Sequence, residues 1–238
     1  MSDATLQPTW HRFLTAVCAL VIFVMLLGLG LLGALSKSAV AFLSDKTHVL
    51  VSAGANVGDN VTGVYSRMQK EALAYNAELT RRYVKGDTVA LPRDPNDRAG
   101  YNAQSVAHLR DVRAVIVPAL YVVLGASVLL VIVLVVCLVS ETERAFLRGC
   151  VWAGASMIAL VVAGAILGTL NFSELFTRFH QLFFAEGTWL FAPDSLLIQT
   201  FPLNFWILEA LIWAGITLFC SVLCVLLGVT TQKRVAKA

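Results

Sequence analysis

Two histidines are the strongest candidates for chemistry, because each stands beside a long apolar run of the chain. His108 lies six residues before the uncharged run 114–140, and His180 lies seven residues after the uncharged run 149–173. An imidazole changes its protonation near neutral pH, so it can act as a general acid or a general base. If the two segments that carry these residues meet, the imidazoles can form one site.

Charged residues accompany His108 on the same predicted helix. Asp111 follows His108 at i+3, which is within reach of one imidazole nitrogen, and Arg110 and Arg113 are close by. Asp111 is therefore predicted to orient His108. Glu209 is the one ionisable residue near the start of the last apolar stretch, and an ionisable group within a membrane span indicates a functional role by default. A structural pairing of Glu209 with an external arginine is the alternative.

Other reaction classes lack their motifs in this chain. His108, Asp111 and His180 supply three ligands in principle, as in an open zinc site, so a metal centre stays an alternative. The sequence contains no H-E-x-x-H, no G-x-S-x-G and no G-x-x-x-x-G-K-[ST] motif. The absence of these three motifs argues against a zinc hydrolase, a serine hydrolase with a G-x-S-x-G motif and an ATP-hydrolysing protein. No metal and no cofactor are predicted.

The composition requires that lipid receive most of the apolar surface. Hydrophobic residues make up 58% of the 238 residues and charged residues only 14%, whereas soluble domains have about 45–50% and about 25%. A soluble globular domain, a disordered chain and a nucleic-acid binder are therefore excluded. The charge is also uneven, since 11 of the 18 basic and 8 of the 15 acidic residues lie in the segment 37–113.

Four uncharged stretches are long enough to cross a bilayer, which takes about 20 apolar residues. They predict transmembrane helices at 13–36, 114–140, 149–173 and 205–232, the last of which begins before its uncharged run 210–232 and includes Glu209. The first stretch has a second interpretation as a signal peptide, because Ala39-Val40-Ala41 resembles a cleavage site. We prefer an uncleaved anchor, since the apolar part of a signal peptide has only about 7–15 residues.

The short connections determine the predicted orientation. The turn 141–148 carries Arg144 and Arg148, and the tail 233–238 carries three basic residues and no acid, whereas 174–204 carries one arginine against three acids. The positive-inside rule then places the tails 1–12 and 233–238 and the turn 141–148 in the cytoplasm. The segments 37–113 and 174–204 are extracytoplasmic. The basic residues of 37–113 are discounted, because the rule is reliable only for loops of up to about 60 residues.

The external segments are predicted to be partly helical. Apolar and tyrosine positions recur at helical spacing from Val61 to Tyr83, through Ala72, Tyr75 and Leu79, which predicts an amphipathic helix. Asn102 is predicted to cap a helix that continues into the second span. A stripe of apolar residues at helical spacing within 172–183 predicts an interfacial helix. The expected fold class is an all-α membrane protein with four transmembrane helices and an extracytoplasmic, partly helical cap.

Two short motifs resemble one known family. Residues 106–112, VAHLRDV, contain an H-x-x-D-V run, and residues 179–184, FHQLFF, form an F-H-x-x-F-F run. Together with Trp189, Leu197-Ile198, Phe201-Pro202 and Phe205-Trp206, they resemble the bacterial lipoprotein intramolecular transacylase family, whose members have four spans. The chain departs from the family at 203–204, where Leu-Asn follows the proline in place of an acidic residue.

The resemblance implies an acyl migration on a diacylated lipoprotein. The sn-2 acyl chain of the glyceryl group would move to the α-amine of the N-terminal cysteine and give a lyso-form lipoprotein, without a cofactor. The implied partners are this lipoprotein and membrane phospholipid, with no nucleic acid, and the implied location is the bacterial cytoplasmic membrane with the active site at the outer leaflet. The implied catalytic residues are His108 and His180, as an acid/base pair of unassigned order, with Asp111; the implied substrate contacts are Arg110, Arg113, Trp189 and Glu209.

A second hypothesis belongs to another class of protein. The chain would then be a non-catalytic membrane assembly or transporter module whose external segment binds a partner. The two hypotheses differ in whether the histidines are required for chemistry.

Overall fold

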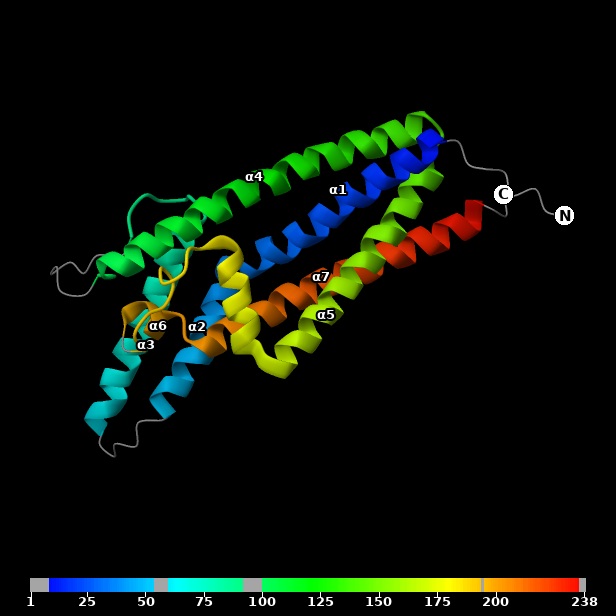
Figure 1. Cartoon of the computed structure of the whole chain (residues 1–238). Coiled ribbons are helices and arrows are strands. Elements are labelled where there is room, and N and C mark those ends of the chain that lie inside the picture. Colours follow the sequence, from blue (N-terminus) through cyan, green and yellow to red (C-terminus); the bar gives the residue numbers. More distant parts are fainter. Residues whose placement is uncertain (1–8, 54–59, 92–99, 194, 236–238) are drawn as a thin grey trace. The chain divides into compact units, whose positions relative to one another are not determined.

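In the part of the chain that the structure describes, the protein is built from helices joined by turns and loops. The computed structural model describes residues 9–53, 60–91, 100–193 and 195–235, and side chains within these ranges except at 48–69 and 233–235. The predicted tails 1–12 and 233–238 thus lie largely outside the described residues. The helices shown in Figure 1 are α1 (Thr9–Ala34), α2 (Lys37–Ala53), α3 (Asn60–Val84), α4 (Ala103–Val139), α5 (Glu143–Phe183), α6 (Leu196–Thr200) and α7 (Leu203–Val235).

The four long helices α1, α4, α5 and α7 have the length and apolar composition needed to cross a membrane. The predicted all-α class with four transmembrane helices is confirmed. The helices extend beyond the uncharged runs, because a charged residue ends such a run without ending the helix. α5 begins at Glu143, so most of the predicted turn 141–148 is helical, and α7 already begins at Leu203.

Contacts divide the chain into two compact units, and the unit boundaries fall within the four long helices. The first unit comprises Met1–Gly30, Tyr121–Leu167 and Ala214–Ala238. The second unit comprises Leu31–Leu120 and Gly168–Trp213. His108 and His180 both belong to the second unit.

Close contacts between helices characterise the first unit. A Cβ atom added at Gly149 of α5 would lie 2.5 Å from the Cβ of Cys18 in α1. A Cβ atom added at Gly154 would lie 2.7 Å from the backbone oxygen of Ser221 in α7. Small residues therefore let the helix backbones approach one another, as expected where lipid removes the hydrophobic drive for association.

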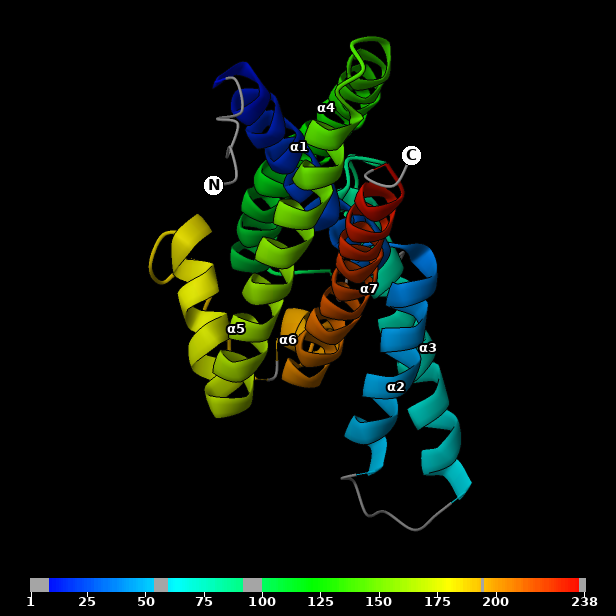
Figure 2. The same ribbon diagram turned by 90° about the vertical axis from the view of Figure 1, so that its right-hand side faces the viewer.

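In the second unit, α2 and α3 lie side by side, as Figure 1 and Figure 2 both show. The extent predicted for the amphipathic helix agrees with α3, and Tyr83 of its predicted stripe is buried, but the stripe is wrong at Ala72 and Tyr75. Ala72 is exposed and Tyr75 has 65% of its surface exposed, whereas Leu73 and Ala77 are buried. Small side chains fit against α2, and the larger tyrosine stays outside. α2 itself was not predicted; it contains Ala39-Val40-Ala41, the stretch that resembles a cleavage site.

Two hydrophobic clusters hold the second unit together. Val40, Leu43, Ala77 and Phe205 join α2, α3 and α7. The other cluster joins α3, α4 and α6 and contains Tyr83, Val84, Tyr101, Leu109 and Leu197. Within it, the buried hydroxyls of Tyr101 and Thr80 lie 2.8 Å apart in a hydrogen bond. Burial raises the pKa of the Tyr101 phenol above its ordinary value, so this group stays neutral and able to donate.

α5 is interrupted at Asn171, where the backbone is non-helical at φ −160° and ψ 93°. The Asn171 side-chain oxygen accepts a hydrogen bond from the backbone N–H of Glu174 at 3.1 Å. Asparagine at this position thus caps a new helical segment. The bend, visible in Figure 1, lies close to the end predicted for the third span, and the segment after it is the predicted interfacial helix.

The close packing of the first unit predicts that Gly154→Ala will destabilise the protein. The added methyl group meets a backbone oxygen and the Val225 side chain, both 2.7 Å away. We expect a loss of about 1–3 kcal/mol, seen as a lower melting temperature in detergent by tryptophan fluorescence. Gly164→Ala is the matched control in the same helix, because nothing lies within 4 Å of its added Cβ. Equal melting temperatures for the two variants would contradict this account.

The buried hydroxyl pair predicts that Tyr101→Phe will also destabilise the protein. The change leaves the Thr80 hydroxyl without this partner, and an unsatisfied buried polar group costs about 1–3 kcal/mol. Thermal unfolding in detergent measures the effect. Tyr75→Phe, in the exposed face of α3, removes the same atom and should leave the melting temperature unchanged.

Candidate active site

The structure brings His108 of α4 and His180 of α5 together within the second unit. The two residues are 7% and 8% exposed, so both imidazoles are buried. Their ring centroids lie 6.2 Å apart and their planes are inclined by 23°. Two residues separated by 72 positions in the sequence thus present nearly parallel rings to each other.

The distance between the rings leaves room for a bridging atom. Two imidazoles joined directly by a hydrogen bond would have their centroids at most about 5 Å apart, given an N···N distance of about 2.9 Å. At 6.2 Å the rings are beyond that limit. A polar atom of a bound molecule could hydrogen-bond to both rings at this spacing.

A backbone hydrogen bond determines the tautomer of His180. Its Nδ1 lies 2.8 Å from the carbonyl oxygen of Phe176, one helical turn earlier. A carbonyl oxygen only accepts hydrogen bonds, so Nδ1 must carry the proton in this contact. In the neutral ring Nε2 then holds the lone pair, which is the arrangement needed to accept a proton from a substrate.

Aromatic side chains surround the two histidines. Phe184 contacts both, with ring centroids 4.9 Å from His108 and 5.6 Å from His180. Phe191 lies 5.4 Å from His108, Phe176 lies 4.0 Å from His180, and Trp189 lies 4.9 Å from His180. These rings exclude water and lower the local dielectric, which strengthens electrostatic interactions within the site.

Two polar nitrogens in this enclosure lack partners in the protein. Nδ1 of His108 and Nε1 of Trp189 are buried and form no hydrogen bond with any described residue. An unsatisfied buried polar group costs free energy, so such groups in a native structure call for an explanation. A bound substrate that forms hydrogen bonds with these two nitrogens would explain why they lack partners in the protein.

The loop that carries Trp189 and Phe191 is tied to α4. The Gln104 side chain, one turn before His108, donates a hydrogen bond to the backbone oxygen of Leu190 at 3.0 Å. Gly187 allows the turn before this loop, since its φ of +81° lies in the region that favours glycine. The tie holds the two aromatic side chains against the histidines.

Asp111 does not pair with His108 as predicted. Asp111 is exposed, and the buried Nδ1 of His108 has no partner among the described residues. The short aspartate side chain, three residues along α4, stays on the open side of the helix while the imidazole faces the enclosure. Arg110 is also exposed on α4.

Arg113 has a structural contact that the prediction of substrate binding missed. Its guanidinium group donates hydrogen bonds to the backbone oxygens of Tyr83 and Thr88. It also lies over the Tyr83 ring, at 4.9 Å from the centroid. Arg113 therefore holds the end of α3 and the following turn against α4.

Glu209 is partly buried in α7, one turn after Phe205. No ion pair among the described residues includes it, so the alternative of pairing with an external arginine is not seen there. The described residues also contain no group of three His, Cys, Asp or Glu side chains that could hold a metal ion. Asp111 in particular does not join the two histidines.

Sequence reasoning did not assign roles to Phe184, Phe191 and Gln104. Phe184 carried a signal, because it closes the F-H-x-x-F-F run. Phe191 and Gln104 had no local signal, since their contacts depend on how the loop 184–195 folds back onto α4.

Known proteins resemble this chain over most of its length. Residues 16–206 match the family model described as lipoprotein intramolecular transacylase Lit. A comparison with curated protein sequences finds no match.

Solved structures of the membrane integral lipoprotein intramolecular transacylase Lit from Bacillus cereus share the fold. One has a TM-score of 0.75 at 20% identity, with 96% of this chain and 99% of that chain covered. A variant of that protein with a histidine replaced by alanine has a TM-score of 0.72 at 20% identity, with both chains fully covered (100% and 100%).

The match to a family of acyltransferases over residues 16–206 sets aside the hypothesis of a non-catalytic membrane module. The chain belongs to the lipoprotein intramolecular transacylase family, and it is an acyltransferase of the membrane.

Proposed function

We propose that this enzyme transfers the sn-2 acyl chain of a diacylglyceryl lipoprotein to the α-amine of the lipoprotein's N-terminal cysteine. The amine nitrogen attacks the ester carbonyl carbon, an N–C bond forms and the bond from that carbon to the glyceryl oxygen breaks. The products are an amide and a free glyceryl hydroxyl. The observation that carries the proposal is the buried, nearly parallel pair His108 and His180 in a chain of this family.

His180 is the base in this proposal. Its Nδ1–H is engaged with the Phe176 carbonyl, which leaves Nε2 with the lone pair. Nε2 accepts the proton that the amine loses as it attacks the ester. The carbonyl also stabilises the imidazolium that forms, because it accepts a hydrogen bond from the ring.

His108 completes the proton transfer. It delivers a proton to the departing glyceryl oxygen and recovers one from the His180 imidazolium through the substrate atom that bridges the two rings, so no net proton enters or leaves. The ring spacing of 6.2 Å suits a substrate atom held between the two imidazoles. The partnerless Trp189 indole N–H is the donor we assign to the oxyanion that develops on the ester carbonyl.

The aromatic enclosure supports transfer over hydrolysis. Water that entered would compete with the amine for the ester, and burial of both histidines argues against such entry. The amine and ester belong to one substrate molecule, so the enzyme has mainly to orient them. Orientation of this kind can contribute about 7–11 kcal/mol to lowering the barrier.

The remaining assignments come from the sequence. The positive-inside rule supports cytoplasmic termini and an active site at the outer leaflet. Exposed Arg110 is assigned to polar groups of the lipoprotein or of a neighbouring phospholipid, and partly buried Glu209 to the substrate amine. Asp111 is assigned only a long-range electrostatic influence on His108.

The first prediction from this mechanism is that His108→Ala and His180→Ala each lower the rate of acyl transfer by about 10²–10⁴-fold. The purified enzyme is given a diacylated lipopeptide, and mass spectrometry of the product locates the acyl chain on the amine or on the glyceryl group.

His11→Ala is the control, because it removes an imidazole from the first unit. Size-exclusion chromatography and circular dichroism establish that each variant is folded. Full activity in a folded His180→Ala variant would refute the assigned base, and acyl transfer from a different glyceryl position would refute the proposed reaction.

The second prediction concerns Trp189→Phe, which keeps an aromatic ring beside His180 and removes only the indole N–H. Loss of one oxyanion donor should lower kcat by about 10²–10³-fold with little change in KM. Trp10→Phe, at an exposed position in α1, should have wild-type kinetics. A raised KM with unchanged kcat would show that Trp189 binds the ground state and is not an oxyanion donor.

A further inference from the structure

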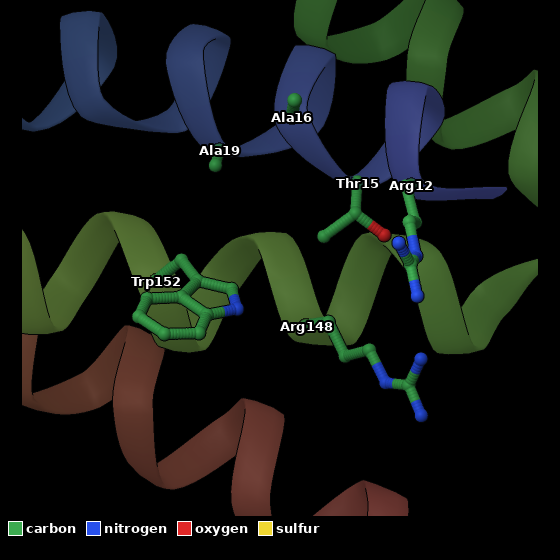
Figure 3. A pocket seen from close by; sticks show the side chains of 6 residues that line it. All are labelled: Arg12, Thr15, Ala16, Ala19, Arg148 and Trp152. Carbon is green, nitrogen blue, oxygen red and sulfur yellow. The ribbon is translucent and has the colours of Figure 1, made fainter. Parts of the chain in front are cut away.

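A groove in the first unit, separate from the histidine site, lies between α1 and α5. Its volume is about 480 Å³. Figure 3 shows the two helices and the six side chains that line the groove, namely Arg12, Thr15, Ala16, Ala19, Arg148 and Trp152. The described mechanism uses none of these residues.

Helical spacing places the lining residues on two facing surfaces. Arg12, Ala16 and Ala19 recur at i, i+4 and i+7 on α1, and Arg148 and Trp152 are an i, i+4 pair on α5. The contact of Gly149 with Cys18 holds the two backbones close together beside the groove. The two surfaces therefore keep a constant spacing, and the alanines leave the space between them open.

The groove is basic at one end and apolar along the rest of its length. Figure 3 shows the guanidinium groups of Arg12 and Arg148 near one end and Trp152 toward the other. Each arginine is the last charged residue before an uncharged run, which begins at Phe13 in α1 and at Gly149 in α5. Both guanidinium groups thus stand where headgroups meet hydrocarbon. The Trp152 side chain is 65% exposed, and indoles favour that interface.

We propose that this groove binds one anionic phospholipid. The lipid phosphate lies between Arg12 and Arg148, whose planar guanidinium groups match phosphate oxygens with paired N–H donors. One acyl chain lies along Ala16 and Ala19 and against the Trp152 ring. A basic pocket between transmembrane helices is a recurrent site for such headgroups. The inference does not depend on the proposed acyl transfer, because a diacylglyceryl lipoprotein anchor carries no phosphate.

A lipid fits the groove better than a free phosphate ion does. A free ion would need only the basic end, whereas the two alanines and the face of the Trp152 ring offer apolar surface that suits an acyl chain. The charge of the two arginines selects an anionic headgroup over a zwitterionic one, since a zwitterion has a cationic group that the arginines repel.

Native mass spectrometry of the detergent-purified chain tests the proposal. The protein is titrated with phosphatidylglycerol or with phosphatidylcholine of the same acyl chains, and lipid-bound and free protein are counted. Wild-type protein should retain one phosphatidylglycerol in preference to phosphatidylcholine. The variant Arg12→Gln with Arg148→Gln should lose about fivefold in phosphatidylglycerol affinity for each charge removed, or about thirtyfold in all.

Two further variants separate the groove from a general effect of charge. Arg82→Gln with Arg178→Gln removes two exposed arginines of the second unit and should bind the lipid as wild type does. Ala16→Trp fills the groove without changing the charge and should lose binding. Each variant is checked for its wild-type elution volume and helical content.

Three results would overturn the proposal. They are unchanged phosphatidylglycerol affinity in the folded Arg12/Arg148 variant, an equal loss in the Arg82/Arg178 variant, and full displacement of the lipid by millimolar inorganic phosphate. The last result would mark the groove as an ion site without a requirement for the acyl chain.

Discussion

The break in α5 at Asn171 is the constraint on which the histidine site depends. If α5 continued straight, His180 would lie about 13 Å beyond Asn171 along the axis of the preceding segment, at 1.5 Å per residue. The hydrogen bond from the Glu174 N–H to the Asn171 side chain caps a separate helical segment instead. That segment, with Phe184 directly after its end, brings His180 and Phe184 against His108 of α4. The Phe176 carbonyl that determines the tautomer of His180 belongs to the same segment, so this segment supplies both the ring and the acceptor that fixes its protonation pattern.

Aromatic side chains enclose the site, and two polar groups inside it lack hydrogen-bond partners. The second feature follows from the first. Aromatic rings around His108 and His180 keep water out, so Nδ1 of His108 and Nε1 of Trp189 have no solvent to bind. Each then carries a free-energy cost that a polar substrate atom can relieve. Stabilising contacts elsewhere in the second unit offset this free-energy cost. The hydroxyl pair of Thr80 and Tyr101 and the guanidinium contacts of Arg113 hold α3 against α4, while Gln104 holds the loop of Trp189.

The helices pack differently in the two units: glycines bring backbones together in the first, and larger apolar side chains form clusters in the second. In the first, Gly149 and Gly154 permit backbone contact, because apolar side chains gain nothing by leaving lipid for one another. In the second, the larger side chains Leu43 and Phe205 pack with Ala77 in a buried cluster. Packing against α2 explains why the predicted face of α3 is wrong at Ala72 and Tyr75. Ala77 packs in the cluster with α2 and Tyr75 stays outside, whereas Tyr83 is buried where α3 meets α4 and α6.

The sequence by itself determined the four apolar helices and the candidacy of His108 and His180. It also determined the cap at Asn102, whose side-chain oxygen accepts a hydrogen bond from the Ser105 N–H at 2.8 Å. Each of these follows from local chemistry: hydrocarbon demands long uncharged helices, and helix caps and short motifs are read from neighbouring residues. The tertiary structure alone decided the pairing of the two rings, the partnerless state of the Trp189 indole and the exposure of Asp111. It also gave Arg113 its backbone contacts with Tyr83 and Thr88. These features depend on chain segments far apart in sequence, and the free energy of bringing such segments together has no signature in the residues that flank either one.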